Sequence, residues 1–145
     1  MKIGVIHGPN LQLLGKREPD VYGHDSLDDV NRALASLAAE LGVTLETMQS
    51  NHEGVIIDFV AKMAPQVGGF LINPGGLTHT SVVLRDALVG VERPFVEVHL
   101  SNTASREEFR RRSYLAPVAA GVVFGFGLQS YLLGLRGLVG RLSAV

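Results

Sequence analysis

The sequence predicts an α/β fold in which a five-stranded parallel sheet is covered by helices on both faces. Short apolar runs alternate with longer segments whose apolar residues recur at helical spacing. The intervening segments have about ten or more residues, as crossovers between parallel strands require. Polar clusters follow the strands, and ligands bind to parallel sheets at that edge. The pattern therefore predicts a parallel α/β sheet with a ligand site at the carboxyl ends of its strands.

Each predicted strand is a short apolar run that ends at a glycine, a proline or a polar residue. The first ends before Gly8-Pro9 and the third before Asn73-Pro74. The predicted strands are Lys2–Ile6, Val43–Met48, Gly69–Ile72, Pro94–Leu100 and Gly121–Phe124.

The clearest predicted helix begins at a capping box formed by Ser26 and Asp29 and ends at Gly42. A second helix is predicted to be capped by Ser50 together with Glu53. Its predicted apolar face consists of Ile56, Phe59, Val60 and Met63.

Two further helices are predicted in the second half of the chain. An apolar stripe ends near Gly90, and Leu128–Leu142 forms the last helix. The segment Ser105–Arg112 also begins like a helix, with acidic residues in its first turn and arginines beyond them. Such a charge run is most often a solvated face, but Arg106 and Arg110 share one side of it.

The composition predicts one domain spanning 1–145. The chain has 145 residues, of which 46% are apolar and 19% charged, as in ordinary globular proteins. Its net charge of −1 gives no general attraction for nucleic acid or a membrane. The lack of cysteine excludes disulfides and a cysteine nucleophile, and it fits a reducing compartment. The longest apolar stretch, Tyr114–Leu135, is interrupted by a proline and glycines, so we expect no membrane span.

Glu97 and His99 form the first candidate for catalysis. They are two residues apart on a predicted strand, so their side chains project from the same face. A carboxylate beside an imidazole orients the ring and favours its charged form, which can deliver a proton. An isolated pair of this kind is more often a structural contact, but its place at the carboxyl end of a strand favours function.

The segment 7–23 is too long for an ordinary strand-to-helix connection, and we expect a lid over about residues 15–24. It carries Arg17 and Tyr22, which would be a cationic group and a phenol above the sheet edge. The alternative is that Tyr22 packs the loop onto the domain while Arg17 lies in solvent.

The segment after the third predicted strand offers hydrogen-bonding groups to a ligand. Gly75-Gly76 allows the backbone to approach closely, and Asn73 and His79 offer polar side chains. The alternative is a simple turn before a helix that Thr80 or Ser81 caps. No phosphate-binding loop motif, nucleophile elbow or metal-ligand spacing occurs, so we expect no metal and no serine nucleophile.

These clusters form an ordered set of motifs over nearly the whole chain: Gly8-Pro-Asn-Leu11, Leu13-Leu-Gly15, Arg17-Glu-Pro19, Tyr22-Gly23, Ser50-Asn-His-Glu-Gly54, Asn73-Pro-Gly75, Thr78-His-Thr-Ser81, Glu97-Val-His-Leu-Ser-Asn102 and Arg106-Glu-Glu-Phe-Arg110. The set resembles that of the type II 3-dehydroquinate dehydratases, and the chain length fits as well. The resemblance implies a flavodoxin-like, three-layer α/β/α domain that dehydrates 3-dehydroquinate to 3-dehydroshikimate without a cofactor or metal.

The resemblance also implies roles for five residues. Tyr22 is expected to be the base that removes a proton from C2, and Arg17 on the lid to stabilise the phenolate and the transition state. Asn10 is expected to position a water on the enolate oxygen. His99, oriented by Glu97, is expected to protonate the departing C1 hydroxyl.

The other matched residues are expected to bind the substrate. The amides of Leu100 and Ser101, with the Ser101 hydroxyl, resemble a carboxylate site. Asn73, His79 and Arg110 match positions that bind the substrate hydroxyl groups. Arg106 matches a residue that supports the base, and Asp86 matches one that reaches the site of a neighbouring subunit.

The resemblance further implies a cytoplasmic enzyme of the shikimate pathway, assembled as a dodecamer of four trimers. The sequence departs from the usual family pattern at positions that carry no proposed catalytic role: His7, Gln12, Leu77, Ser130 and Gly134.

Two alternatives belong to other functional classes. One is a flavodoxin-like module that binds a nucleotide or another small ligand without catalysis, which predicts a phosphate loop after the first strand. The other is a structural oligomer, which predicts the loss of Tyr22, Arg17 or His99.

Overall fold

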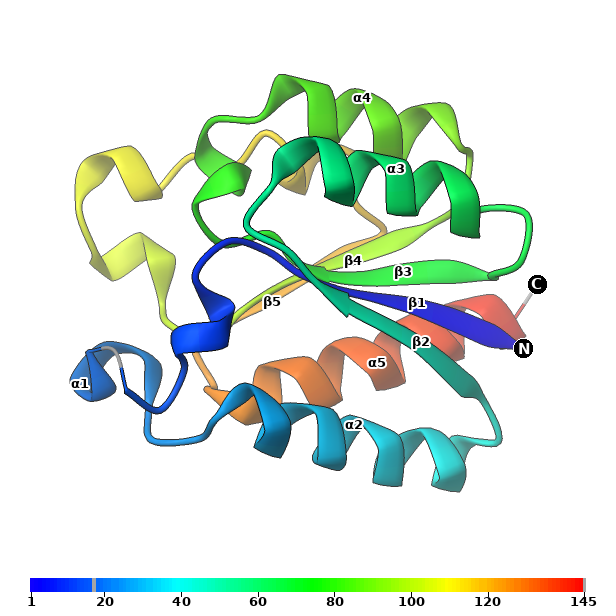
Figure 1. Cartoon of the computed structure of the whole chain (residues 1–145), viewed down its shortest axis with the longest axis horizontal. Helices are drawn as coiled ribbons and strands as arrows, with labels where there is room; N and C mark the ends of the chain where they lie inside the picture. Colours follow the sequence, from blue (N-terminus) through cyan, green and yellow to red (C-terminus); the bar gives the residue numbers. More distant parts are fainter. Residues whose placement is uncertain (17, 145) are drawn as a thin grey trace.

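A computed structural model of the chain describes residues 1–16 and 18–144, and in it five strands form one parallel sheet (Figure 1). The strand order is β2-β1-β3-β4-β5, with every neighbouring pair parallel, which is the order of flavodoxin-like folds. This confirms the predicted fold class. The strands are β1 (Lys2–His7), β2 (Thr44–Gln49), β3 (Gly69–Asn73), β4 (Phe95–His99) and β5 (Gly121–Phe124).

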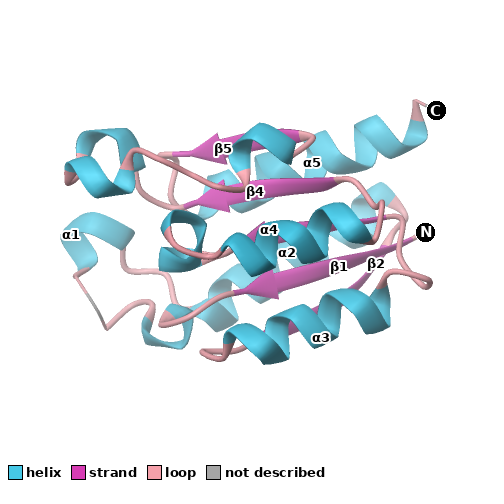
Figure 2. Cartoon of the chain, turned by 90° about the horizontal axis from the view of Figure 1, so that it is seen from above, coloured by secondary structure: helices cyan, strands magenta, loops and turns pink. Residues whose placement is uncertain are grey.

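Helices cover both faces of the sheet (Figures 1 and 2). One face is covered by α2 (Leu27–Leu41) and α5 (Leu128–Ser143), and the other by α3 (Glu53–Met63) and α4 (Val82–Gly90). The short helix α1 (Pro19–Tyr22) lies beyond the carboxyl ends of the strands, where the loops gather (Figure 2).

The predicted helix caps are confirmed at some helices and corrected at one. At α2, Ser26 and Asp29 form the predicted capping box, and Gly42 ends the helix in the left-handed conformation with φ of 72°. Ser81 caps α4, one of the two residues expected to do so. The predicted cap of α3 by Ser50 is wrong: Ser50 accepts a hydrogen bond from the N–H of His52 and stabilises the turn before the helix.

The segment between β4 and β5 also differs from the prediction. Ser105–Arg112 does not form an α-helix; the described residues there adopt short 3₁₀ turns at Thr103–Ser105 and Glu108–Arg110. Its single large apolar side chain, Phe109, is 65% exposed, so no apolar stripe packs the segment onto the sheet. Helices this short draw their stability from such packing, and propensity alone does not replace it.

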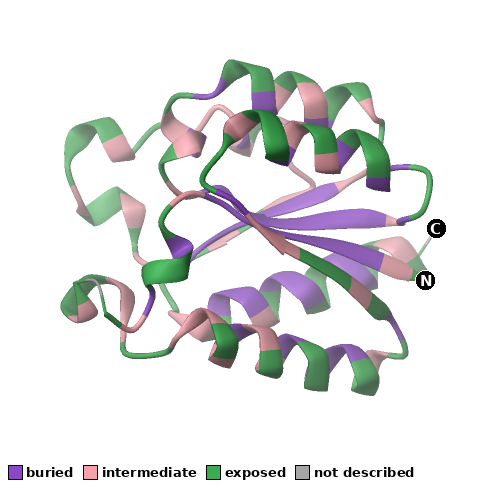
Figure 3. Cartoon of the chain, viewed as in Figure 1, coloured by how far each residue is buried: buried purple, intermediate pink, exposed green. Residues whose placement is uncertain are grey.

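Alternating residues of each strand face the two helical layers, and the central strands β1, β3 and β4 are buried, whereas the edge strands β2 and β5 are partly exposed (Figure 3). On β4, Val96 and Val98 pack in the α2/α5 core, whereas Phe95 packs in the α3/α4 core. Glu97 and His99 therefore lie on the α3/α4 face. On β1, His7 follows Val5 onto the α2/α5 face, and Asn73 pairs with it on β3.

Two glycines permit close approaches that hold this arrangement together. A Cβ at Gly8 would lie 2.5 Å from the Pro74 carbonyl oxygen, so only glycine lets the loops after β1 and β3 touch. A Cβ at Gly134 would lie 2.9 Å from Cδ1 of Leu71, so this position lets α5 pack closely against the sheet. The departure at Gly134 thus has a packing reason.

Candidate active site

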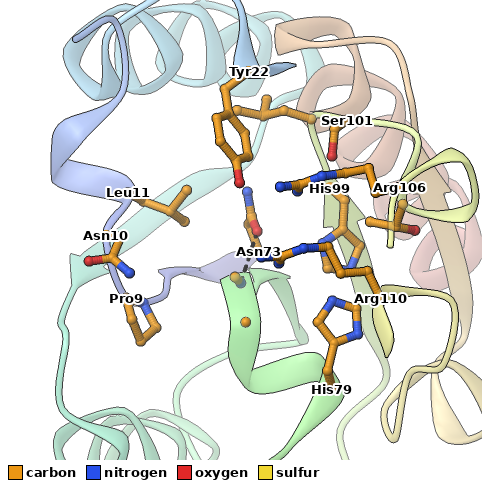
Figure 4. A pocket seen from close by; sticks show the side chains of 14 residues that line it. Pro9, Asn10, Leu11, Tyr22, Asn73, His79, His99, Ser101, Arg106 and Arg110 are labelled. Atoms are coloured by element: carbon orange, nitrogen blue, oxygen red, sulfur yellow. Dashed lines mark hydrogen bonds between the residues drawn. The ribbon is translucent and has the colours of Figure 1, made fainter. Parts of the chain in front are cut away.

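A cavity of about 160 Å³ lies at the carboxyl ends of β1, β3 and β4 (Figure 4). This is the edge at which the polar clusters of the sequence were expected to meet. Nine of the twelve predicted catalytic and substrate-binding residues line it: Asn10, Tyr22, Asn73, His79, His99, Leu100, Ser101, Arg106 and Arg110.

Of the other three predicted site residues, Glu97 and Asp86 do not line this cavity. Glu97 lies directly behind His99 and is bonded to it. Asp86 is exposed on α4, away from the cavity of its own chain. Arg17 lies outside the residues that the structure describes. Sequence reasoning gave no role to Thr103 or Leu11, which also line the cavity.

His99 and Glu97 form a short, buried contact. His99 Nε2 lies 2.6 Å from Glu97 Oε1, so Nε2–H donates to the carboxylate. The side chain of His99 is 10% exposed and that of Glu97 only 1%. With Nε2 held in this way, Nδ1 is the ring nitrogen available to a ligand.

Two hydroxyl groups to which the sequence assigned no role complete the surroundings of Glu97. Thr78 Oγ1 donates to Glu97 Oε1, and Ser113 Oγ lies 2.9 and 3.0 Å from the two carboxylate oxygens. Ser113 Oγ in turn accepts from the N–H groups of Leu115 and Ala116, each at 3.0 Å. A side-chain pair two residues apart on a strand is visible in a sequence, whereas these partners come from separate loops.

The charge state of Glu97 follows from these contacts. Burial raises its pKa, but hydrogen bonds from His99, Thr78 and Ser113, together with the charge of His99, outweigh burial and hold the pKa below its usual value. The carboxylate is therefore ionised at neutral pH. An ionised carboxylate at this position stabilises the positively charged ring of His99, which is the state of a proton donor.

His79 approaches the cavity from the loop after β3. Its Nδ1 lies 2.7 Å from the carbonyl oxygen of Arg112, so Nδ1 donates, and in the neutral ring Nε2 is an acceptor. The rings of His79 and His99 stack with centroids 6.5 Å apart. Together they present two ring nitrogens to one small space.

Tyr22 points its hydroxyl into the cavity from α1 (Figure 4). The guanidinium carbon of Arg106 lies 5.1 Å from the Tyr22 ring centroid. Arg110 is held by Glu107 through its Nε, and its outer nitrogens point toward the cavity (Figure 4). Two permanent positive charges beside a polar cavity suit a small anionic ligand.

Asn10 holds an unusual backbone conformation at the edge of the site. Its φ is 70°, in the left-handed region that asparagine tolerates better than most residues. Its N–H donates to Asn51 Oδ1 at 2.9 Å, which ties the loop after β1 to the loop after β2. Among residues 1–16 and 18–144, no group of three metal-ligating side chains is found, and no helix is long and apolar enough to cross a membrane.

Comparisons with known proteins identify the family of the chain. The family model for dehydroquinase class II matches residues 1–139. The chain is 56% identical over 139 residues to a 3-dehydroquinate dehydratase of Trichodesmium erythraeum, covering 96% of this chain and 93% of that protein. It is 55% identical over 143 residues to a 3-dehydroquinate dehydratase of a Nostoc species, covering 99% and 97% of the two chains.

Solved structures give the same result for the fold. A type II dehydroquinase of Butyrivibrio crossotus superposes with a TM-score of 0.93 at 41% identity, covering 95% of this chain and 97% of that one. A type II dehydroquinase of Propionibacterium acnes gives a TM-score of 0.91 at 37% identity, with 96% of each chain covered. The flavodoxin-like fold is thus that of the type II dehydroquinases. The chain belongs to the class II dehydroquinase family.

Proposed function

We propose that this chain is a type II 3-dehydroquinate dehydratase, a hydro-lyase that removes water from 3-dehydroquinate by anti elimination to give 3-dehydroshikimate. The observation that carries the proposal is the meeting of a phenol, a carboxylate-bound imidazole and two guanidinium groups around one cavity. The substrate is a small polyhydroxy acid with one carboxylate, so these charges and hydrogen-bonding groups suit it.

The first half of the reaction is assigned to Tyr22 as the base. Its phenolate removes a proton from C2, and the electrons of the C–H bond move toward the C3 ketone to form an enolate. Arg106 lies beside the ring, and Arg17 on the lid is proposed to stabilise the transition state. Asn10 is proposed to hold a water against the enolate oxygen.

The second half is assigned to His99 as the acid. The enolate expels the C1 hydroxyl, and His99 Nδ1 protonates this oxygen so that it leaves as water. Glu97 keeps the ring oriented through Nε2 and stabilises its positive charge before the transfer. Tyr22 then releases its proton to solvent and His99 takes one up, so both groups regain their starting states.

Substrate binding is assigned to the remaining polar groups of the cavity. Ser101, with the amide of Leu100, is proposed to take the carboxylate. Asn73, His79 and Arg110 are proposed to form hydrogen bonds with the hydroxyl groups of the substrate. Arg106 is proposed to act mainly through the base, because it lies against the Tyr22 ring.

Turnover provides the direct test. The purified chain is incubated with 3-dehydroquinate, and the ultraviolet absorbance of the conjugated product is followed. Tyr22→Phe is expected to lower kcat by at least about 1,000-fold while substrate still binds, because the ring remains and only the base is removed. A folded wild-type chain without turnover would contradict the proposed function, and a fully active Tyr22→Phe variant would contradict the assigned base.

Borohydride distinguishes this chemistry from covalent catalysis by lysine. None of the three lysines, Lys2, Lys16 and Lys62, lines the described cavity. Reduction in the presence of substrate is therefore expected to leave the protein mass unchanged and the activity intact. A mass increase would indicate an imine and exclude the proposed mechanism.

We also propose that residues 1–145 act as one catalytic domain, with a lid over about 15–24, in a cytoplasmic dodecamer of four trimers. Exposed apolar side chains on β5 and in the turn that follows, among them Phe124 and Phe126, support a covered face. Asp86 on the exposed side of α4 is assigned to a neighbouring subunit's site. Light scattering gives the mass of the assembly, and a monomer with full activity would contradict these two assignments.

A further inference from the structure

A line of hydrogen-bonded side chains lies under the cavity, on the face covered by α2 and α5. His7, at the end of β1, is fully buried. Its Nδ1 lies 2.8 Å from Tyr131 Oη on α5, and its Nε2 lies 2.8 Å from Asn31 Oδ1 on α2. The Tyr131 hydroxyl also interacts with the side chain of Asn73, which is paired with His7 in the sheet. Of these four residues, Asn73 is the one that lines the cavity.

The direction of every hydrogen bond in this line is set by one backbone group. The N–H of Gly75 lies 3.1 Å from Asn73 Oδ1 and can only donate, so Asn73 must turn its NH₂ group toward Tyr131. The Tyr131 oxygen then accepts from Asn73, and its own hydrogen goes to His7 Nδ1. His7 consequently carries its proton on Nε2 and donates to Asn31 Oδ1.

The groups in this line are uncharged at neutral pH, so the pattern is stable there. Burial lowers the pKa of His7 to about 4, against the opposing effect of its hydrogen bond to Asn31. Burial also raises the pKa of Tyr131, so its hydroxyl keeps its hydrogen. A neutral imidazole offers one donor and one acceptor, which is the combination that the line requires.

We propose that His7, Tyr131 and Asn31 are positioning residues that lock the Asn73 amide in one orientation, with its second Nδ2 hydrogen directed at a substrate oxygen. The inference rests on the proposed function in that it gives Asn73 a substrate hydroxyl to bind. Turning the amide over would set its NH₂ group against the Gly75 N–H, two donors facing each other in a buried place. The locked amide therefore offers the substrate a donor without reorganisation on binding.

Tyr131→Phe tests this inference, because it removes the hydroxyl and keeps the ring. The variant is expected to raise KM for 3-dehydroquinate about tenfold and to change kcat by less than about threefold, since binding is lost and the proton-transfer groups remain. Leu138→Val is the matched control. Leu138 is fully buried two turns further along α5, so it reports the effect of core destabilisation alone, and its KM is expected to stay at the wild-type value.

Substitutions of His7 separate positioning from packing. His7→Leu removes the acceptor that faces Tyr131 and is expected to raise KM about as much as Tyr131→Phe. His7→Asn restores an acceptor at the δ position of the side chain, so it is expected to recover most of the affinity although it loses the bond to Asn31. Equal KM values in His7→Leu and His7→Asn would overturn the proposed role.

A double-mutant cycle shows whether Tyr131 acts through Asn73. In an Asn73→Ala background, Tyr131→Phe is expected to have no further effect on KM, because the amide that it positions is gone. If the two substitutions raised KM independently, so that their effects multiplied in the double variant, the inference would be overturned.

A spectroscopic readout keeps failure of this inference distinct from failure of the proposed function. Nitrogen-15 NMR of the histidine rings is expected to show His7 neutral at pH 7 with its proton on Nε2, whether or not the chain turns over 3-dehydroquinate. A proton on Nδ1 would overturn the direction of the line. A wild-type chain that lacks activity but has this tautomer would refute the assigned substrate and leave the locked amide in place.

Discussion

The two faces of the sheet end in different buried polar networks at one cavity. On the α3/α4 face, Glu97 is ionised and holds His99, with Thr78 and Ser113 donating to the carboxylate. On the α2/α5 face, His7 is joined to Tyr131 and Asn31, and this line carries no charge at neutral pH. Both faces bury a histidine, yet they hold it in opposite charge environments. A histidine beside a carboxylate can serve in proton transfer. A buried histidine without one stays neutral and can hold neighbouring side chains in fixed positions.

This difference follows from the register of the strands. His99 lies on β4 two residues after Glu97, so both project from the same face and meet directly. His7 lies on β1 two residues after Val5 and meets neutral partners from the helices above it. Burial without a charged partner lowers the pKa of His7, whereas His99 lies against an ionised carboxylate, so two residues of the same type have different surroundings.

Among variants of the two networks, the largest expected effect comes from neutralising the charged one. Glu97→Gln is expected to lower kcat by about 100- to 1,000-fold with little change in KM, because the amide keeps the ring oriented but no longer stabilises its charge. Steady-state kinetics measure both quantities. Glu46→Gln on β2, where the side chain is exposed, is the control and is expected to keep wild-type activity. A variant with a raised KM and an unchanged kcat would contradict the assignment of proton transfer to the charged network.

The neutral network is expected to control stability in acid. The pKa of His7 is about 4 in the folded chain, against the ordinary histidine value of 6.5, so protonation favours the unfolded state. Its contribution is fully present above pH 6.5 and is lost as the pH falls toward 4, by about 3 kcal/mol. Denaturant unfolding across this range measures the loss.

His7→Asn is expected to remove that part of the pH dependence, since asparagine does not titrate. The depressed pKa of Glu97 also costs stability at low pH, but this contribution is common to the wild type and the variant and cancels in the difference. His24→Asn, at an exposed histidine, controls for the loss of a ring as such. A variant with an unchanged slope between pH 6.5 and 4 would show that His7 is not held neutral.

The smallest expected effect concerns one partner of Glu97. Ser113→Ala removes a donor to the carboxylate, so the pKa of Glu97 is expected to rise and kcat to fall about tenfold. The loss of activity on acidification should therefore begin at a higher pH than in the wild type, which a pH–rate profile records. Ser36→Ala, exposed on α2, is the control. A profile that stays in place would mean that Ser113 packs the loop and does not tune the acid.

The sequence was sufficient for the fold because its strands and helices carry strong local patterns. The capping box at Ser26 and the apolar run of β5 were found at their bounds. Ser105–Arg112 misled the prediction because helical charge placement occurs there without a buried face. Local propensity and tertiary packing agree at Ser26 and at β5, and they conflict in Ser105–Arg112.

The cavity was predictable wherever its residues follow strands, since parallel strands bring their carboxyl ends to one edge. The neutral network was not predictable. His7 and Tyr131 are 124 positions apart, and Tyr131 lies within an apolar helix where it resembles an ordinary core residue. The partners of Glu97, Thr78 and Ser113, are 19 and 16 positions away from it on separate loops. Hydrogen bonds between distant segments leave no periodic signal.

The division of labour between the two networks is tested most directly by combining Glu97→Gln with Tyr131→Phe. If one network moves protons and the other fixes an amide, the double variant has the kcat loss of the first and the KM rise of the second. The two losses in kcat/KM then multiply to within a factor of about two. A double variant that is no worse than Glu97→Gln alone would contradict the account, because it would mean that both networks serve the same step.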